Sequence, residues 1–373
     1  MTSDTVAQPH RIDLCGVRLD VRTDHAELAD YLAAQFPAPD VARADEPDVA
    51  VTVRWTEGPR PDLRPERVFP DWPVDATIDR HVFTGGARIL WLRVDDAAQI
   101  AVASERPARG PRRFELRFHF TLGATGWRES AKRLLAWRRV PALRRNRLST
   151  LAYYAVYYPT WWHLEAQGLG HPLHAAGVAL DGRAVVLAGL PGAGKSTLAM
   201  ALVGAPGAEL LADNVVLHDG RQVQGCFEPL LLDDRTRGWV GAQLALRPLG
   251  RRHVFARDAY HAAHRTGGVL PGAVVLVSRG RETRLDPVGA AECAHRLLAI
   301  NEVAKEVRRY HVLAAILGMV EPEGLARVDE RGERLERLLT GVPCYRLQVR
   351  HGAPDEAVAA LRAALAPVRQ VAR

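Results

Sequence analysis

The chain has 373 residues, of which 47% are hydrophobic and 25% charged, and this composition is typical of a globular protein long enough for two domains. Its formal net charge of +7 at pH 7 favours an anionic partner, and a nucleotide meets that requirement. No run approaches the roughly 18 apolar residues of a membrane span, and no signal peptide begins the sequence, so we expect a cytoplasmic protein without a membrane partner. The four cysteines form no C-x-x-C pair, so we expect neither a disulfide framework nor a zinc site.

Residues 1–125 predict a small α+β domain that serves recognition or assembly. Apolar or alternating segments between about His10 and Leu122 indicate several strands. The helical spacing of residues 25–36 predicts one helix, with Asp24 placed to cap it. No catalytic constellation stands out in this part of the chain.

Residues 126–170 predict a basic and aromatic helical connector. The stretch Arg128–Arg147 is rich in arginine, which suits either nucleic acid, an acidic peptide or a solvated helix face. Since no nucleic-acid motif accompanies it, we expect no nucleic-acid partner. Residues 148–169 then predict one helix, or two broken at Pro159, with aromatic side chains that pack.

Next, two short apolar runs flank Asp181-Gly182, the strongest short signal for a β-hairpin. The second arm of this hairpin leads into VVLAGLPGAGKST, residues Val185–Thr197, which fits G-x-x-x-x-G-K-[ST]. The strand before the loop and the helix after it are the context that a phosphate-binding P-loop requires. The expected nucleotide-binding residues are Gly189, Leu190, Pro191, Gly192, Ala193, Gly194, Lys195, Ser196 and Thr197.

Within this loop, Lys195 is expected on the β/γ-phosphates and the Ser196 hydroxyl on Mg²⁺. The chain contains only three lysines, Lys132, Lys195 and Lys305, so a lysine in this position is informative.

Two further residues are candidates for acid–base chemistry. Asp213 ends the strand after the P-loop helix, and a strand end beside the P-loop strand would bring its carboxylate to the γ-phosphate and Mg²⁺. His174, at the start of the hairpin, is placed to polarise Asp213 or to contact the transferred phosphate. The alternatives are a turn or capping role for Asp213 and a buried structural role for His174. Further strands and helices are expected up to residue 366.

The order of histidine, hairpin, P-loop, strand and aspartate resembles the catalytic domain of the HPr kinase/phosphorylase family. Relatives of that family accompany bacterial peptide natural-product pathways, including lasso-peptide tailoring. The resemblance implies an α/β fold, with a P-loop kinase domain of the HPr kinase/phosphoenolpyruvate carboxykinase type over residues 171–373. It also implies ATP and Mg²⁺ as cofactors and a possible homo-oligomer.

In that family, Lys195 matches the P-loop lysine, Ser196 the metal-binding hydroxyl, Asp213 the general base and His174 the histidine before the loop. The resemblance thus implies Lys195, Asp213 and His174 as catalytic residues. Asn214 replaces the second aspartate of the family pair, so the implied metal ligands are Ser196, Asp213 and Asn214. The family's E-I-R-G-x-G stretch has no clear copy, although Glu228 and Arg251 are weak candidates.

We therefore expect a kinase that transfers the γ-phosphoryl group of ATP to a Ser or Thr hydroxyl of a peptide or protein. Two alternatives stay open: a kinase of a small metabolite or free amino acid, and a non-catalytic nucleotide-sensing module.

Overall fold

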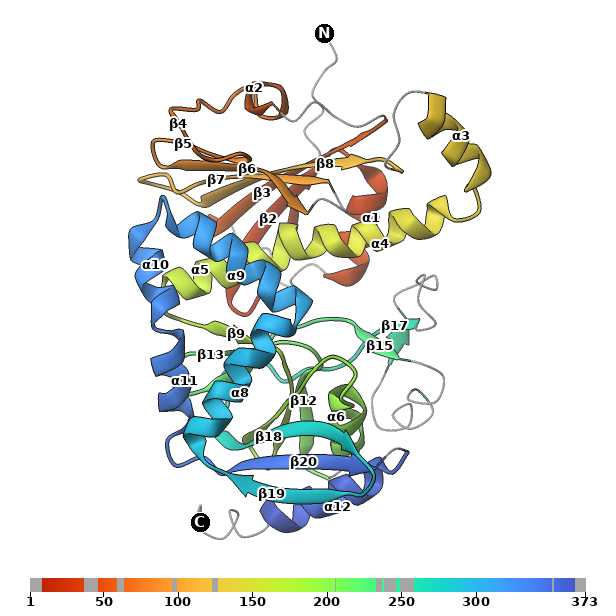
Figure 1. The fold of residues 1–373 in the computed structure, drawn as a ribbon, viewed down its shortest axis with the longest axis vertical. Helices are drawn as coiled ribbons and strands as arrows, with labels where there is room; N and C mark the ends of the chain where they lie inside the picture. Colours follow the sequence, from red (N-terminus) through yellow and green to blue (C-terminus); the bar gives the residue numbers. More distant parts are fainter. Residues whose placement is uncertain are drawn as a thin grey trace. The chain divides into compact units, whose positions relative to one another are not determined.

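The computed structural model describes residues 9–36, 46–58, 64–95, 99–122, 127–204, 206–232, 237, 246–248, 258–350 and 352–365. Over these residues the chain is mixed α/β and divides into two compact units (Figure 1). The described residues of unit 1 fall within Met1–Ala166 and Val312–Ala326, and those of unit 2 within Gln167–Gly250, Arg257–His311 and Arg327–Arg373. Residues 127–166, expected as a connector, are thus part of unit 1.

Unit 1 is built on an eight-stranded sheet. Its spatial order is β1 (His10–Leu14), β2 (Val17–Thr23), β3 (Val49–Glu57), β8 (Arg112–Phe120), β7 (Ile100–Glu105), β6 (Arg88–Asp95), β5 (Val82–Gly85) and β4 (Ala76–Asp79). The pairs β2–β3 and β3–β8 are parallel, and the other pairs are antiparallel. Alternate residues of β3 are buried, so that Val49, Val51 and Val53 supply one apolar face of the sheet.

The helices of unit 1 are α1 (Ala26–Gln35), α2 (Pro65–Val68), α3 (Trp127–Leu135), α4 (Val140–Ala152), the π-helical turn η1 (Tyr153–Tyr157) and α5 (Tyr158–Ala166). The run α4–η1–α5 continues past Pro159 because the wide turn η1, in which Tyr158 donates to the carbonyl of Tyr153, accommodates the missing proline N–H. The prediction that Asp24 caps α1 is wrong, because His25 is the N-cap residue. The Asp24 carboxylate instead accepts the backbone N–H of Trp55 at 3.2 Å.

A buried ion pair lies in unit 1. The Arg112 guanidinium is bonded to the Glu321 carboxylate, and both side chains are at most 5% exposed. The Trp162 indole N–H donates to the same carboxylate at 3.2 Å, and the Arg112 guanidinium lies 5.5 Å from the Trp162 ring centroid. Glu321 belongs to the segment Val312–Ala326, so this network fixes that segment within unit 1.

Unit 2 contains a six-stranded mixed sheet. Its order is β12 (Ala208–Ala212), β10 (Ala175–Leu180), β11 (Arg183–Ala188), β18 (Pro271–Gly280), β20 (Cys344–Arg350) and β19 (Arg284–Val288). Two three-stranded sheets accompany it: β14 (Val223–Gly225), β13 (Val216–His218) and β9 (His171–Leu173), and β15 (Leu230–Leu232), β17 (Asp258–His261) and β16 (Arg247–Pro248).

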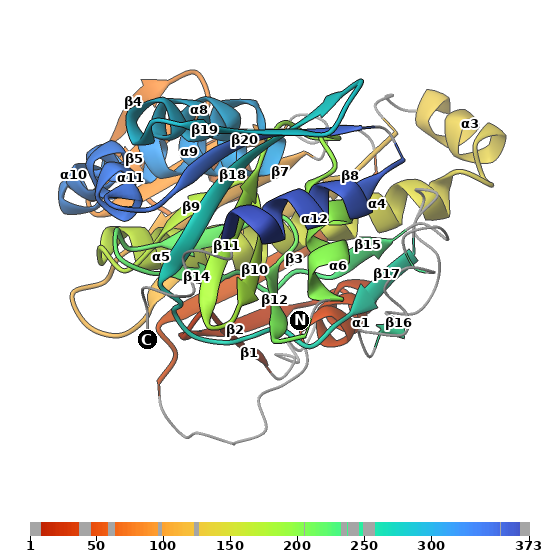
Figure 2. The same cartoon turned by 90° about the horizontal axis from the view of Figure 1, so that it is seen from below.

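The helices of unit 2 cover both faces of the six-stranded sheet (Figure 2). One core cluster contains residues of α6 (Lys195–Val203) and α12 (Pro354–Leu365), and the other contains residues of α8 (Ala290–Val303) and α11 (Arg331–Leu339). Two more helices, α9 (Lys305–Gly318) and α10 (Pro322–Asp329), have residues in both units. In the part of the chain that the structure describes, no helix is long and apolar enough to cross a membrane.

We expect Glu321→Ala to destabilise the protein by about 3–5 kcal/mol, because it leaves the buried Arg112 guanidinium without its carboxylate. Urea unfolding followed by circular dichroism measures this loss. The matched control is Arg11→Ala, which removes a pair of 3.7 Å to Asp20 from a side chain that is 53% exposed, and it should cost at most about 1 kcal/mol. Equal losses in the two variants would contradict the importance of the buried pair.

Candidate functional site

The glycine loop joins β11 to α6 with the geometry that its sequence requires. Gly192 and Gly194 have φ angles of 82° and 102°, a region that favours glycine, and a Cβ at either position would find nothing within 4 Å. Gly189 is needed for a different reason, since a Cβ there would lie 2.4 Å from the Val277 carbonyl oxygen of β18. The loop backbone is therefore open to a ligand on one side and tightly packed on the other.

The Lys195 side chain turns back toward this loop and is only 6% exposed. Its Nζ donates to the carbonyl oxygens of Gly189 at 2.8 Å and Leu190 at 3.4 Å, and lies 3.0 Å from His174 Nε2. Burial lowers the pKa of Lys195 to about 8, although the carboxylates of Asp213 and Glu306 act in the opposite direction. Those two carboxylates are thus close enough to Lys195 to act on its charge.

His174 is held as a neutral imidazole. Burial, and then the Lys195 charge, lower the pKa of His174 to about 3. An ammonium only donates, so Nε2 accepts from Lys195 and the imidazole proton resides on Nδ1. Within the described residues, this Nδ1 is buried and has no hydrogen-bond partner. It is therefore an available donor inside the site.

Asn301 of α8 fixes the backbone that carries His174. Its Oδ1 accepts the His174 backbone N–H at 2.9 Å, and its Nδ2 donates to the Pro172 carbonyl at 3.1 Å. The Asn301 side chain is 3% exposed, so both bonds are protected from water. Neither Asn301 nor Glu306 was expected from the sequence, because they lie more than a hundred residues after the P-loop hairpin begins and belong to no motif.

The sheet topology brings Asp213 to the same edge as the loop. One expectation was wrong, because β12 does not lie beside the P-loop strand β11; β10 lies between them. However, β10 is antiparallel to both neighbours, so β11 and β12 run in the same direction and end at the same edge. Asp213 directly follows β12, and His174 directly precedes β10 at that edge.

Asn214 follows Asp213 and points to a further carboxylate. Its Nδ2 donates to Glu228 Oε2 at 3.1 Å, and Glu228 is 7% exposed. The sequence offered Glu228 only as a weak candidate, whereas Arg251 lies outside the described residues. Glu228 therefore forms a polar pair with Asn214, the residue that follows Asp213.

The residues present fit a nucleoside triphosphate with Mg²⁺. The glycine backbone is open, the His174 Nδ1 donor is buried, and Ser196 and Thr197 are half-buried in the first turn of α6, where N–H groups lack intrahelical acceptors. Among the described residues, no group of three or more His, Cys, Asp or Glu is arranged to hold a metal ion. A nucleotide-bound Mg²⁺ does not require one, since it takes one or two carboxylates together with phosphate oxygens and waters.

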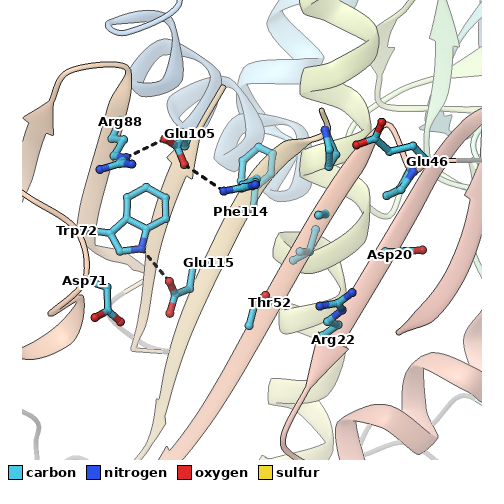
Figure 3. Close-up of a pocket in the computed structure, with 15 residues that line it drawn as sticks. Asp20, Arg22, Glu46, Thr52, Asp71, Trp72, Arg88, Glu105, Phe114 and Glu115 are labelled. Atoms are coloured by element: carbon cyan, nitrogen blue, oxygen red, sulfur yellow. Dashed lines mark hydrogen bonds and ion pairs between the residues drawn. The ribbon is translucent and has the colours of Figure 1, made fainter. Parts of the chain in front are cut away.

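Unit 1 has a groove of about 650 Å³ on the polar face of its sheet (Figure 3). Two of its carboxylates have partners in the groove: Glu105 accepts from Arg88 at 2.9 Å, and Glu115 accepts the Trp72 indole N–H at 2.8 Å. The sequence singled out none of these residues, and the described residues that line the groove include no nucleophile–base pair.

Comparison of the chain with protein-family models and with curated proteins finds no match.

We expect His174 to make the protein sensitive to acid. The folded pKa of about 3 lies below the unfolded value of 6.5, so the unfolded state alone takes up a proton between these limits. Stability is therefore lost as the pH falls from about 6.5 to 3, by about 1.4 kcal/mol per pH unit for this group. Urea unfolding at several pH values measures the slope.

His174→Gln should remove one proton from that pH dependence, because glutamine does not titrate. A pH dependence unchanged in His174→Gln would show that His174 titrates normally in the fold.

Proposed function

We propose that this chain is an ATP-dependent phosphotransferase whose nucleotide site is the glycine loop of unit 2. One observation carries the proposal: the Lys195 ammonium is held between the loop carbonyls and His174, at the sheet edge where Asp213 follows β12. Phosphoryl transfer depends mainly on positioning and on neutralising phosphate charge, which is what this arrangement offers. A glycine turn that only connects a strand to a helix needs no buried ammonium.

Each residue has a role in the proposed reaction. ATP supplies the γ-phosphoryl group. The amides of the loop and of the first turn of α6 hold its phosphates, and Lys195 neutralises the charge on the β- and γ-phosphates. Ser196 and Asp213 would hold Mg²⁺, with Asn214 beside them. The acceptor oxygen attacks the γ-phosphorus, the bond from that phosphorus to the β-phosphate oxygen breaks and ADP leaves, while the Asp213 carboxylate accepts the proton of the acceptor hydroxyl. Neutral His174 accepts from Lys195 with Nε2 and so keeps Lys195 in place, and its Nδ1–H donates to the transferred phosphate.

For the acceptor we favour a Ser or Thr hydroxyl of a peptide or protein. The support is unit 1, which has a large sheet and a charged groove and whose described residues form no candidate catalytic group. A peptide is held along several residues and uses such a surface, whereas a small metabolite or free amino acid does not. If the γ-phosphoryl group is transferred to small molecules but not to peptides, the protein is a small-molecule kinase. Nucleotide binding without any transfer would indicate a sensing module.

We expect Lys195→Ala to weaken ATP·Mg²⁺ binding by about 2–3 kcal/mol, the scale of a charge-assisted bond to phosphate.

Asp213→Asn should leave nucleotide binding nearly intact and slow transfer by roughly 10²–10⁴-fold, which is typical of a positioned general base. Transfer of labelled γ-phosphate to candidate peptides measures the rate, and calorimetry measures the binding.

The matched control is Asp219→Asn, because the Asp219 carboxylate only accepts the backbone N–H groups of Arg221 and Gln222 in a turn. It should leave transfer unchanged. Near-full transfer by Asp213→Asn would place the base elsewhere, and normal binding and turnover by Lys195→Ala would refute the nucleotide site.

Nucleotide binding should also take up protons near pH 8. The free protein has a Lys195 pKa of about 8, and a phosphate beside the ammonium raises it. At pH 8 we therefore expect uptake of about half a proton per ATP bound, measured by calorimetry in buffers of different ionisation enthalpy. Lys195→Arg keeps the charge but cannot titrate in this range, so it should bind without this uptake. Equal uptake in both proteins would assign the proton to another group.

A further inference from the structure

Four large apolar side chains of unit 1 are exposed in one short stretch, α3 and the turn that follows it. Their exposed fractions are 76% for Trp127, 76% for Leu134, 86% for Leu135 and 63% for Trp137. Scattered single apolar residues on a surface are ordinary, whereas a cluster of this kind marks an interaction site. In Figures 1 and 2, α3 lies at the periphery of unit 1.

The sequence of α3 places its apolar residues on one helical face. Trp127, Ala131, Leu134 and Leu135 follow the spacing i, i+4, i+7 and i+8, which forms a single apolar stripe. A stripe of this kind normally packs against the core of its own domain. In α3 it is exposed instead.

The polar side of α3 is the side that contacts the rest of unit 1. The Arg133 guanidinium lies 3.2 Å from the Glu57 carboxylate and 5.5 Å from the Phe120 ring centroid. Lys132 Nζ donates to the Leu122 carbonyl at 3.4 Å. These contacts fix the rotation of the helix about its axis and hold the apolar stripe toward solvent.

Exposed cations surround the stripe. Arg128, Lys132, Arg138 and Arg139 are all exposed, and residues 127–139 contain a single acid, Glu129. The Arg128 guanidinium lies 5.8 Å from the Trp127 ring centroid, and that of Arg138 lies 5.2 Å from the Trp137 ring centroid. Each indole thus combines an apolar body with a neighbouring positive charge, a combination suited to the boundary between lipid headgroups and acyl chains.

The charge and the shape of this surface select its occupant. A second copy of the chain would bring two basic helices together, and their like charges repel. A peptide is normally held in a groove, whereas these side chains are 63–86% exposed and none of them lines the groove of unit 1. A flat anionic surface meets both conditions.

We propose that α3 docks unit 1 onto an anionic membrane surface. Trp127, Leu134, Leu135 and Trp137 enter the outer part of the bilayer, and the exposed Arg128, Arg138 and Arg139 pair with lipid phosphates. Our sequence-based expectation of no membrane partner considered only membrane-spanning segments, and an interfacial helix needs none. The proposal is independent of the nucleotide site.

The test is flotation of the full-length protein with vesicles of mixed phosphatidylcholine and phosphatidylglycerol, and with vesicles of phosphatidylcholine alone. The wild-type protein should bind the anionic vesicles at low salt, release from them at high salt, and bind the neutral vesicles far more weakly. The double variant Arg138→Gln/Arg139→Gln should bind the anionic vesicles about 10- to 30-fold more weakly.

A triple variant, Trp127→Ser/Leu134→Ser/Leu135→Ser, should weaken vesicle binding by roughly 10²-fold or more, because it removes the apolar stripe. Each of these side chains is at least 76% exposed, so the fold and ATP binding should be unchanged. The matched control is Ile78→Ser/Leu169→Ser/Met319→Ser, which replaces three side chains that are 45%, 62% and 52% exposed outside α3 and should bind like the wild type.

Three results would overturn the proposal. The first is no binding of the wild type to anionic vesicles at low salt, and the second is binding by the triple variant equal to that of the wild type. The third is a wild-type dimer in light scattering that the triple variant converts to monomer without any vesicle binding by either protein, which would make a second copy the occupant of α3.

Discussion

A buried ammonium group is the constraint on which the candidate site depends. Removing a charge from water is costly, and the interior must return the lost hydrogen bonds. Lys195 has three N–H donors, and the structure supplies three acceptors: the carbonyls of Gly189 and Leu190 and His174 Nε2. Asp213 and Glu306 oppose the effect of burial on its pKa. In the proposed function, a phosphate in the loop would offer stronger acceptors than two carbonyls, so ligand binding would relieve a cost that the free protein carries.

The state of His174 follows from this arrangement. A protonated imidazole would place two positive charges 3.0 Å apart in a buried site, so His174 is neutral and accepts with Nε2. The acceptor atom must face Lys195, and this is possible only if the chain before β10 is fixed. Asn301 fixes it through the His174 N–H and the Pro172 carbonyl. Helix α8, far along the chain, thereby fixes the position of His174, which accepts from Lys195.

The sequence predicts the parts of this site that depend on neighbouring residues. The hairpin at Asp181-Gly182 is confirmed: both residues have positive φ, and β10 and β11 pair around them. The strand and helix flanking the glycine loop are also confirmed. Sequence reasoning was wrong where partners distant along the chain decide. Asp24 was expected to cap α1 but bonds to β3, and β12 was expected beside β11 but pairs with β10.

Helix α3 shows the same limit on sequence reasoning. Its basic residues suggested a solvated connector, because a count of charges does not say which side of a helix is buried. The contact of Arg133 with Glu57 supplies that information, since it turns a charged side inward and leaves Leu134 and Leu135 exposed. Elsewhere in unit 1, Arg112 turns inward and is neutralised by Glu321, and the groove carboxylate Glu105 pairs with Arg88. The apolar stripe of α3 is exposed among the described residues, and an external apolar surface is what would bury it.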